Sequence, residues 1–127
     1  MQDKHIYEYA IVRVVPDVER EEFVNAGVIL FCKHKKYVRM QYLLNAEKIQ
    51  ALLPDADLQE IQKNLDAFCN IASGKKEGGP IATLTEAERF RWLTAVRSAT
   101  IQTSRPHPGV TTDLDSTFEK LFHDMVQ

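Results

Sequence analysis

The sequence predicts an α+β domain, in which a small antiparallel sheet of three or four strands packs against three to four helices. Two observations carry this prediction. The hydrophobic pattern changes near residue 44, from the alternation of strands to the spacing of amphipathic helices. The strands are also gathered before the helices instead of alternating with them. With 127 residues, 44% of them apolar, the chain has the size and composition of a single domain spanning residues 1–127.

Three strands are predicted in the first third of the chain. Residues 5–15 are rich in β-branched and aromatic types, and Pro16 ends the run. Both faces of this strand are largely apolar, so we expect helices or a second subunit to cover both of them. Residues 27–32 and 36–43 predict two further strands, and the short turn of three lysines and a histidine between them predicts a hairpin.

The remainder of the chain shows helical spacing in four segments, at residues 46–52, 57–72, 85–99 and 113–126. Each segment has a side chain placed to cap its first turn: Asn45, Asp57, Thr85, and Thr112 with Asp115.

Loops and a short strand are predicted between the helices. Residues 73–80 contain three glycines and a proline and predict an exposed flexible loop. Residues 101–104 can add a short fourth strand, and two prolines exclude a helix from residues 105–109. The inner faces of these elements predict the core, for which we expect the following side chains to be buried: Ile11, Val28, Leu30, Leu65, Phe68, Leu93, Phe118 and Leu121.

Charge and cysteine content bear on partners and location. The chain has 16 basic and 18 acidic residues, and its formal charge of −2 argues against nucleic acid and against an anionic membrane as partners. No apolar run is long enough to span a membrane, and no secretory signal precedes the first strand. Cys32 and Cys69 both lie in apolar patterns typical of buried free thiols, so we expect a cytoplasmic protein.

The familiar motifs of catalysis are absent from the sequence. The four histidines are scattered, and no two have the spacing of zinc ligands. The glycines near residue 78 fit neither phosphate-binding fingerprint, and no serine lies in a nucleophile elbow. We therefore expect no metal and no cofactor.

One polar cluster is nevertheless a candidate site. Arg13 starts from a mostly apolar strand face, and a guanidinium there needs a carboxylate or an external anion. Glu22 and Asn25 follow in a charged segment that leads into a buried strand. If Glu22 satisfies Arg13, the pair is structural. If a guanidinium nitrogen stays free beside Arg97 or Arg105, a phosphate or carboxylate could bind there.

Two segments, residues 9–17 and 22–31, resemble the opening of the bacterial DUF3037 family, a domain of unknown function. The second segment contains the pattern Glu-Phe-x-Asn-x-Gly-Val. The end of the chain is similar as well, through Arg89-Phe90, residues 101–104 and a final helix with Leu121-Phe122. The resemblance implies a small bacterial cytoplasmic protein whose gene lies near those of HipA-type kinases. It implies no catalytic residues.

Two classes of function follow from the sequence. The first is a non-catalytic protein-interaction or accessory module, which the resemblance suggests could partner a HipA-like kinase. We also expect a homodimer, joined through one face of the first strand or through the side of the helix at residues 85–99 that carries Trp92. The alternative is a small enzyme or binder of an anionic or nucleotide-like ligand that uses the arginine, glutamate and asparagine cluster. Convergence of those side chains in a closed pocket would favour the alternative.

Overall fold

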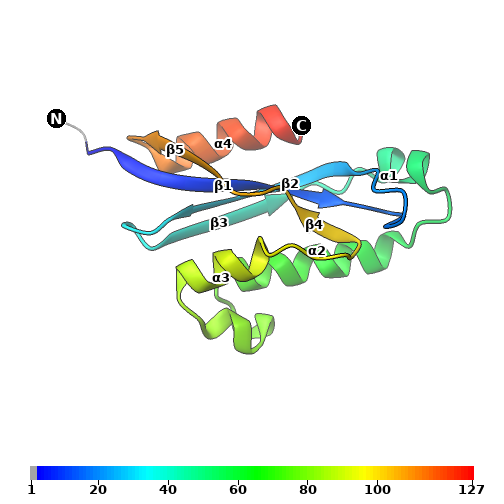
Figure 1. Ribbon diagram of the computed structural model, residues 1–127, viewed down its shortest axis with the longest axis horizontal. Coiled ribbons are helices and arrows are strands. Elements are labelled where there is room, and N and C mark those ends of the chain that lie inside the picture. The colour runs from blue at the N-terminus through cyan, green and yellow to red at the C-terminus, as the bar shows by residue number, and fades with distance from the viewer. Residues whose placement is uncertain (1–2) are drawn as a thin grey trace.

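A five-stranded antiparallel sheet organises the chain in the computed structural model, which describes residues 3–127. The α+β class is thus confirmed, with one strand more than the sequence predicts. The strands are β1 (His5–Val14), β2 (Val24–Cys32), β3 (Tyr37–Tyr42), β4 (Ile101–Thr103) and β5 (His107–Thr111). Strands β3, β2 and β1 lie side by side in that order, and both β4 and β5 pair with the remaining edge of β1 (Figure 1).

Strands β4 and β5 act as one interrupted strand along β1. Val12 pairs with Thr103, and Tyr9 pairs with His107. An advance of three residues along β1 is therefore matched by an advance of four residues from β4 to β5, a stretch that contains one extra residue. Ser104 fills the interruption: its amide donates to the carbonyl of Ile11 at 2.8 Å, and its hydroxyl accepts from the amide of Ile11 at 2.9 Å. The extra residue is a bulge, and it allows a segment with two prolines to stay on the sheet edge.

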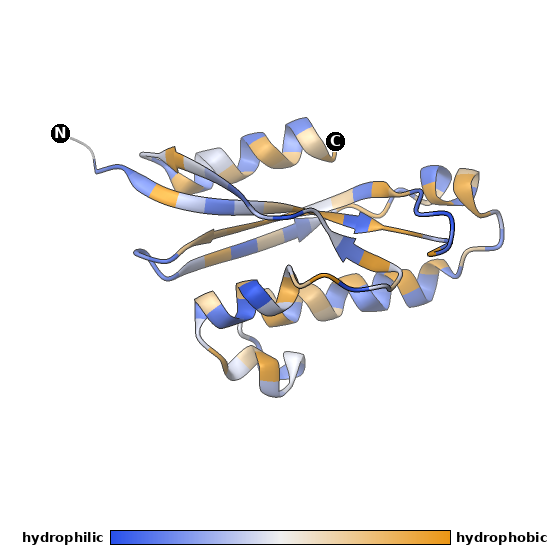
Figure 2. Cartoon of the chain, in the orientation of Figure 1, coloured by the Kyte–Doolittle hydropathy of each residue, from blue (hydrophilic) through white to orange (hydrophobic). Residues whose placement is uncertain are grey.

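Helices cover both faces of the sheet. Helices α1 (Ala46–Leu52), α2 (Leu58–Ala72) and α3 (Glu86–Leu93) lie on one side, and α4 (Leu114–Met125) lies on the other (Figure 1). The predicted loop contains two short 3₁₀ turns, η1 (Lys76–Gly78) and η2 (Pro80–Thr83). Hydrophobic and hydrophilic residues alternate along α2 and α4, as amphipathic helices require (Figure 2). The chain thus covers both apolar faces of β1 with its own helices.

The helix ends confirm three of the four predicted caps. Asn45, Asp57 and Thr85 each accept a hydrogen bond from a backbone amide of the first turn. The cap of α4 is Asp113, whose carboxylate accepts from the amide of Ser116, so the prediction of Thr112 with Asp115 was wrong by one position. Helix α3 stops at Leu93, well short of the predicted residue 99.

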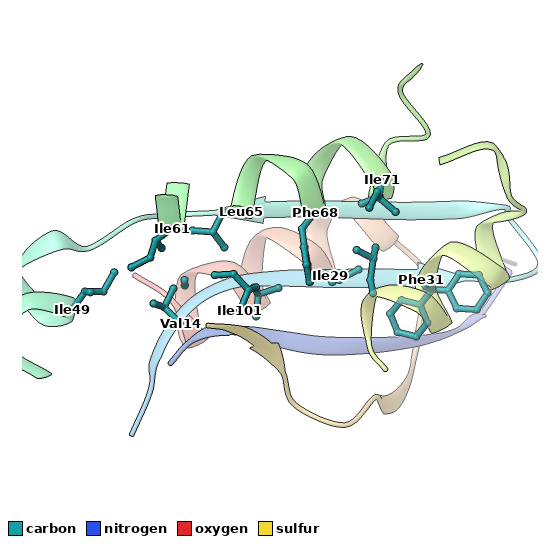
Figure 3. Close-up of a cluster of buried hydrophobic side chains, with 14 residues drawn as sticks. Val14, Ile29, Phe31, Ile49, Ile61, Leu65, Phe68, Ile71 and Ile101 are labelled. Carbon is teal, nitrogen blue, oxygen red and sulfur yellow. The ribbon is translucent and has the colours of Figure 1, made fainter. Parts of the chain in front are cut away.

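Two hydrophobic clusters lie on the two faces of the sheet. The larger joins α1, α2 and α3 to the strands, and Figure 3 shows Ile61, Leu65 and Phe68 along the face of α2 that is turned toward the strands, with Phe68 directed at Ile29 of β2. The smaller joins α4 to the other face, where Phe118 is fully buried against Val28 and Leu30. All the side chains predicted for the core are buried except Leu121, which is half-buried at the edge of the smaller cluster.

Candidate functional site: the apolar end of the sheet

The sheet extends beyond α3 at the end where β1 begins (left in Figure 1). Ile6 of β1 pairs with Val110 of β5, and their side chains are 73% and 59% exposed. Pro108 lies two residues from Val110 on the same side of β5, and Phe31 of β2 pairs with Glu8 next to them. We call the surface formed by Ile6, Phe31, Pro108 and Val110 the apolar end.

An open hollow of about 860 Å³ lies at the apolar end. Its walls come from the start of β1, from β5, and from the end of β2 with the turn that follows it. The residues that line it are Lys4, His5, Ile6, Tyr7, Glu8, Phe31, Lys33, His34 and Pro108. Phe31 forms the link to the core, because its ring stacks on Phe90 of α3 with centroids 4.9 Å apart.

Basic side chains surround this hollow. Lys4, Lys33 and His34 line it, and among its described lining residues Glu8 is the one carboxylate. The turn from Cys32 to Tyr37 adds two further lysines, and all four turn residues are exposed. The three ion pairs found within residues 3–127 join Arg20 to Glu22 and Arg39 to Asp115 and Glu119, so none of them neutralises these lysines.

The opposite side of the same strand ends is packed with aromatic rings that hold β5 in place. Tyr7 lies over Gly109, where a Cβ would come within 2.3 Å of the phenol. The ring of Tyr9 lies tilted against that of His107, with centroids 5.3 Å apart, and both tyrosines pack against the α4 cluster. Only glycine leaves room for Tyr7, and this contact fixes the position of β5 at the apolar end.

The predicted cluster of Arg13, Glu22 and Asn25 forms only in part. Arg13 pairs with Asn25 across β1 and β2, beside a bulge that shifts the register at Val12. The Asn25 amide donates to the carbonyl of Met125 at the end of α4, at 3.2 Å. Glu22 does not join them, because its carboxylate accepts from Arg20 at 2.6 Å.

Arg13 instead stacks on an aromatic ring. Its guanidinium carbon lies 4.2 Å from the centre of the Phe23 ring. The Nε atom is buried and has no hydrogen-bond partner within the described part of the chain. Of the two alternatives left open by the sequence, the structure shows no ion pair between Glu22 and Arg13: Arg13 makes a cation–π contact with Phe23, the residue that follows Glu22.

The other two predicted arginines make no hydrogen bond or cation–π contact with the groups around Arg13 in the described residues. Arg97 is on the α2 and α3 side of the sheet, where it stacks on Phe68 and Trp92 and donates to the carbonyl of Trp92. Burial lowers the pKa of the Arg97 guanidinium. Arg105 is exposed in the bulge between β4 and β5. The structure thus pairs Arg13 with Asn25, and within residues 3–127 neither side chain forms a hydrogen bond or ion pair with Glu22, Arg97 or Arg105.

The remaining reactive groups show no catalytic arrangement in residues 3–127. Both cysteines are free, and burial raises the pKa of the Cys69 thiol to about 11, so it is protonated near neutral pH. In the described residues, no three histidine, cysteine or acidic side chains gather as metal ligands would. The longest helix there, α2, has 15 residues, and no helix is both long and apolar enough to cross a membrane.

Sequence reasoning did not find the apolar end. It treated Ile6 as one more apolar residue of a covered strand and did not predict β5. A signal was available in the alternation of residues 107–111, where Pro108 and Val110 fall on one side and His107 and Gly109 on the other. Lys4 and Glu8, which flank Ile6, also mark the start of that strand as solvated.

Comparison with known proteins gives one family. Residues 9–126 match the model of a family described as a protein of unknown function (DUF3037). No curated protein and no solved structure matches the chain. The match includes Phe31, Pro108 and Val110 of the apolar end and begins three residues after Ile6.

Proposed function

This chain belongs to the DUF3037 family, and from that premise we propose that it is a non-catalytic module that binds another protein through its apolar end. The partner we propose is a HipA-like kinase, as the family resemblance implies. The binding would take place in the cytoplasm, a location with which two free thiols are compatible.

The exposure of Ile6 and Val110 is the observation that carries this proposal. The two side chains face the same side of the sheet, next to each other and next to a hollow with Phe31 at its inner wall. Exposed apolar residues that stand alone are common, but a contiguous group rimmed by polar side chains marks an interaction surface. A protein segment seated there would bury both side chains and fill the hollow.

A second copy of the chain fits this surface less well than a different protein. The sequence predicts a homodimer through one face of the first strand or through the Trp92 side of a helix; helices of the same chain cover most of both sheet faces, and Trp92 is 38% exposed. A two-fold contact through the apolar end would bring the same patch of both copies together, so two lysine-rich surfaces would adjoin each other. Light scattering at increasing concentration tests this, and a dimer abolished by Val110→Asp would identify the second copy as the occupant.

The alternative function, an enzyme or binder of an anionic ligand, has less geometric support. Within residues 3–127 the Nε atom of Arg13 has no hydrogen-bond partner, but Glu22 pairs with Arg20 and Arg97 stacks on Trp92, so neither side chain joins Arg13. A phosphate at Arg13 would therefore meet one guanidinium and one amide. An increase in melting temperature with added nucleotide, lost in Arg13→Gln, would favour this alternative over the binding module.

The test of the binding module uses two matched valines. Purified chain is titrated with a purified HipA-type kinase by calorimetry. Val110→Asp should weaken the complex about tenfold or more, which is the range expected for a central apolar contact. Val96→Asp is the control, because Val96 is 104% exposed in the loop after α3. Absence of a complex, or equal effects of the two substitutions, would reject the proposal.

A further inference from the structure

The charges around the hollow indicate what kind of segment it accepts. Lys33 and His34 line it from the β2–β3 turn, and Lys4 lines it from the start of β1. Lys35 and Lys36 complete the turn, so three lysines lie within four residues, although the chain as a whole is slightly acidic. This local excess of positive charge stands directly beside an apolar surface.

Little in the described structure neutralises these lysines. Glu8 lines the hollow together with two of them, and neither it nor any other acid forms an ion pair with Lys4, Lys33, Lys35 or Lys36. Lys35 lines a second, smaller depression on the α4 side together with two acids, Asp113 and Asp115. Asp113 is already engaged as the cap of α4, and Asp115 accepts hydrogen bonds from Tyr37 and Arg39.

The backbone of the turn gives a second observation. Lys36 has φ of 51°, one of two non-glycine residues with positive φ in residues 3–127. Glycine or asparagine is favoured at such a position, and another side chain there costs about 1 kcal/mol. The sequence thus carries a lysine where an uncharged residue would fold more easily.

We propose that the apolar end binds a short acidic segment of a partner protein, which inserts an apolar side chain into the hollow and places carboxylates on the lysines around it. This inference rests on the proposed function and specifies the chemistry of the partner. Opposite charges around an apolar contact select the partner and speed its association. The concave shape favours a protruding side chain of a protein over a flat lipid surface.

The direct test uses three fluorescein-labelled peptides, in which leucine alternates with glutamate, glutamine or lysine. By fluorescence anisotropy the glutamate peptide should bind most tightly, and its affinity should fall as salt is raised. In amide NMR spectra of the chain, the chemical-shift changes caused by this peptide should concentrate at Ile6, Phe31 and His34. Equal affinity for the glutamate and lysine peptides, or shifts centred elsewhere, would overturn the proposal.

Charge variants then separate this surface from general electrostatics. The double variant Lys4→Gln with Lys33→Gln should lower the affinity for the glutamate peptide about fivefold, since each exposed ion pair contributes a factor of roughly two to three in affinity. Lys120→Gln is the control, because Lys120 is an exposed lysine on α4. Equal loss in both variants would overturn the proposal. So would binding to vesicles of phosphatidylcholine and phosphatidylserine without binding to the peptide.

The same variants distinguish the two proposals in this article. If the kinase complex depends on Val110 but not on Lys33 or on salt, the proposal of a protein-binding module is supported and the proposal of an acidic partner segment is rejected. If the glutamate peptide binds as described but no kinase complex forms, the acidic segment stands and the partner is a different protein.

Discussion

Two residues, Lys36 in the β2–β3 turn and Arg13 in β1, have a backbone conformation or a contact that the sequence pattern does not reveal. The polar turn at residues 33–36 was predicted, but the left-handed backbone of Lys36 was not, because nothing in a lysine indicates it. The neighbourhood of Arg13 is similar. Sequence proximity brought Glu22, Phe23 and Asn25 into consideration together, and only the fold decides which of them reaches the guanidinium.

Lys36→Gly should raise the free energy of unfolding by about 0.5 kcal/mol. Glycine removes the cost of the left-handed backbone, and the greater entropy of the unfolded chain offsets part of that gain. Lys35→Gly is the matched control: it removes the same charge without a positive φ, so it should lower stability. Urea denaturation measures both, and a loss of equal size in the two variants would contradict the role given to the Lys36 backbone.

Arg13→Gln should lower the free energy of unfolding by about 1 kcal/mol, because it removes a half-buried cation–π contact. Phe23→Leu removes the same contact from the other side. The double variant should therefore lose less than the sum of the two single losses, whereas strictly additive losses would show that the stacked pair contributes nothing.

At the scale of elements, the presence and type of an element follow from sequence more reliably than its limits. The hairpin of β2 and β3 and the first three caps were predicted because each depends on a few adjacent residues. Helix α3 ends early because residues 95 and 96 are exposed and have no core to face, while Thr94 donates its hydroxyl to the carbonyl of Phe90. Strand β5 was missed because a proline such as Pro108 is tolerated only in an edge strand, and a sequence does not identify which strand is at the edge.

Gly27 is required by the close pairing of β2 and β3. A Cβ there would lie 2.6 Å from the Gln41 carbonyl oxygen and 3.1 Å from the Tyr42 Cβ, and backbone cannot yield as a side chain can. Gly27→Ala should cost about 2 kcal/mol and increase hydrogen exchange in β3. Gly79→Ala is a contrast of a different kind: no atom lies within 4 Å of its added Cβ, but its φ of 75° strains an alanine, so it should lower stability without raising exchange in β3. Unchanged exchange in β3 after the Gly27 substitution would contradict this account.

Helix α4 should show two different costs on two of its inward positions. Phe118 is 0% exposed, lies under Arg39 at 4.3 Å and stacks beside Phe122, so Phe118→Ala should cost about 3–5 kcal/mol. Leu121 is half-buried, so Leu121→Ala should cost about 1–2 kcal/mol. Equal costs in thermal denaturation would mean that Leu121 belongs to the core after all.

At the scale of the whole molecule, one sheet is shared by two hydrophobic clusters. Successive residues of β2 alternate between them: Val28 and Leu30 enter the α4 cluster, and Ile29 and Phe31 enter the other. If β2 unfolds, both clusters therefore lose the side chains that it contributes to them. The α+β class was predictable from the order of periodic patterns, whereas which helix covers which face depends on long-range packing that those patterns do not encode.

This shared sheet should make unfolding a single transition. Trp92 is the one tryptophan, and it lies against Phe68 in the larger cluster. Phe118→Ala, in the opposite cluster, should still shift the Trp92 fluorescence transition by as much as it shifts the circular dichroism of the helices. A fluorescence transition that stays in place while the helical signal moves would show that the two clusters unfold separately.

The bulge between β4 and β5 also bears on how copies of this chain could polymerise. One border of the sheet carries Pro106, Pro108 and an irregular backbone, and proline cannot donate the hydrogen bond that an incoming strand needs. The other border is β3, which is regular and contains no proline or glycine. Two chains joined along β3 would present a proline-containing border on each outer side. Edge-to-edge growth would therefore stop at a pair and could not propagate into a fibril.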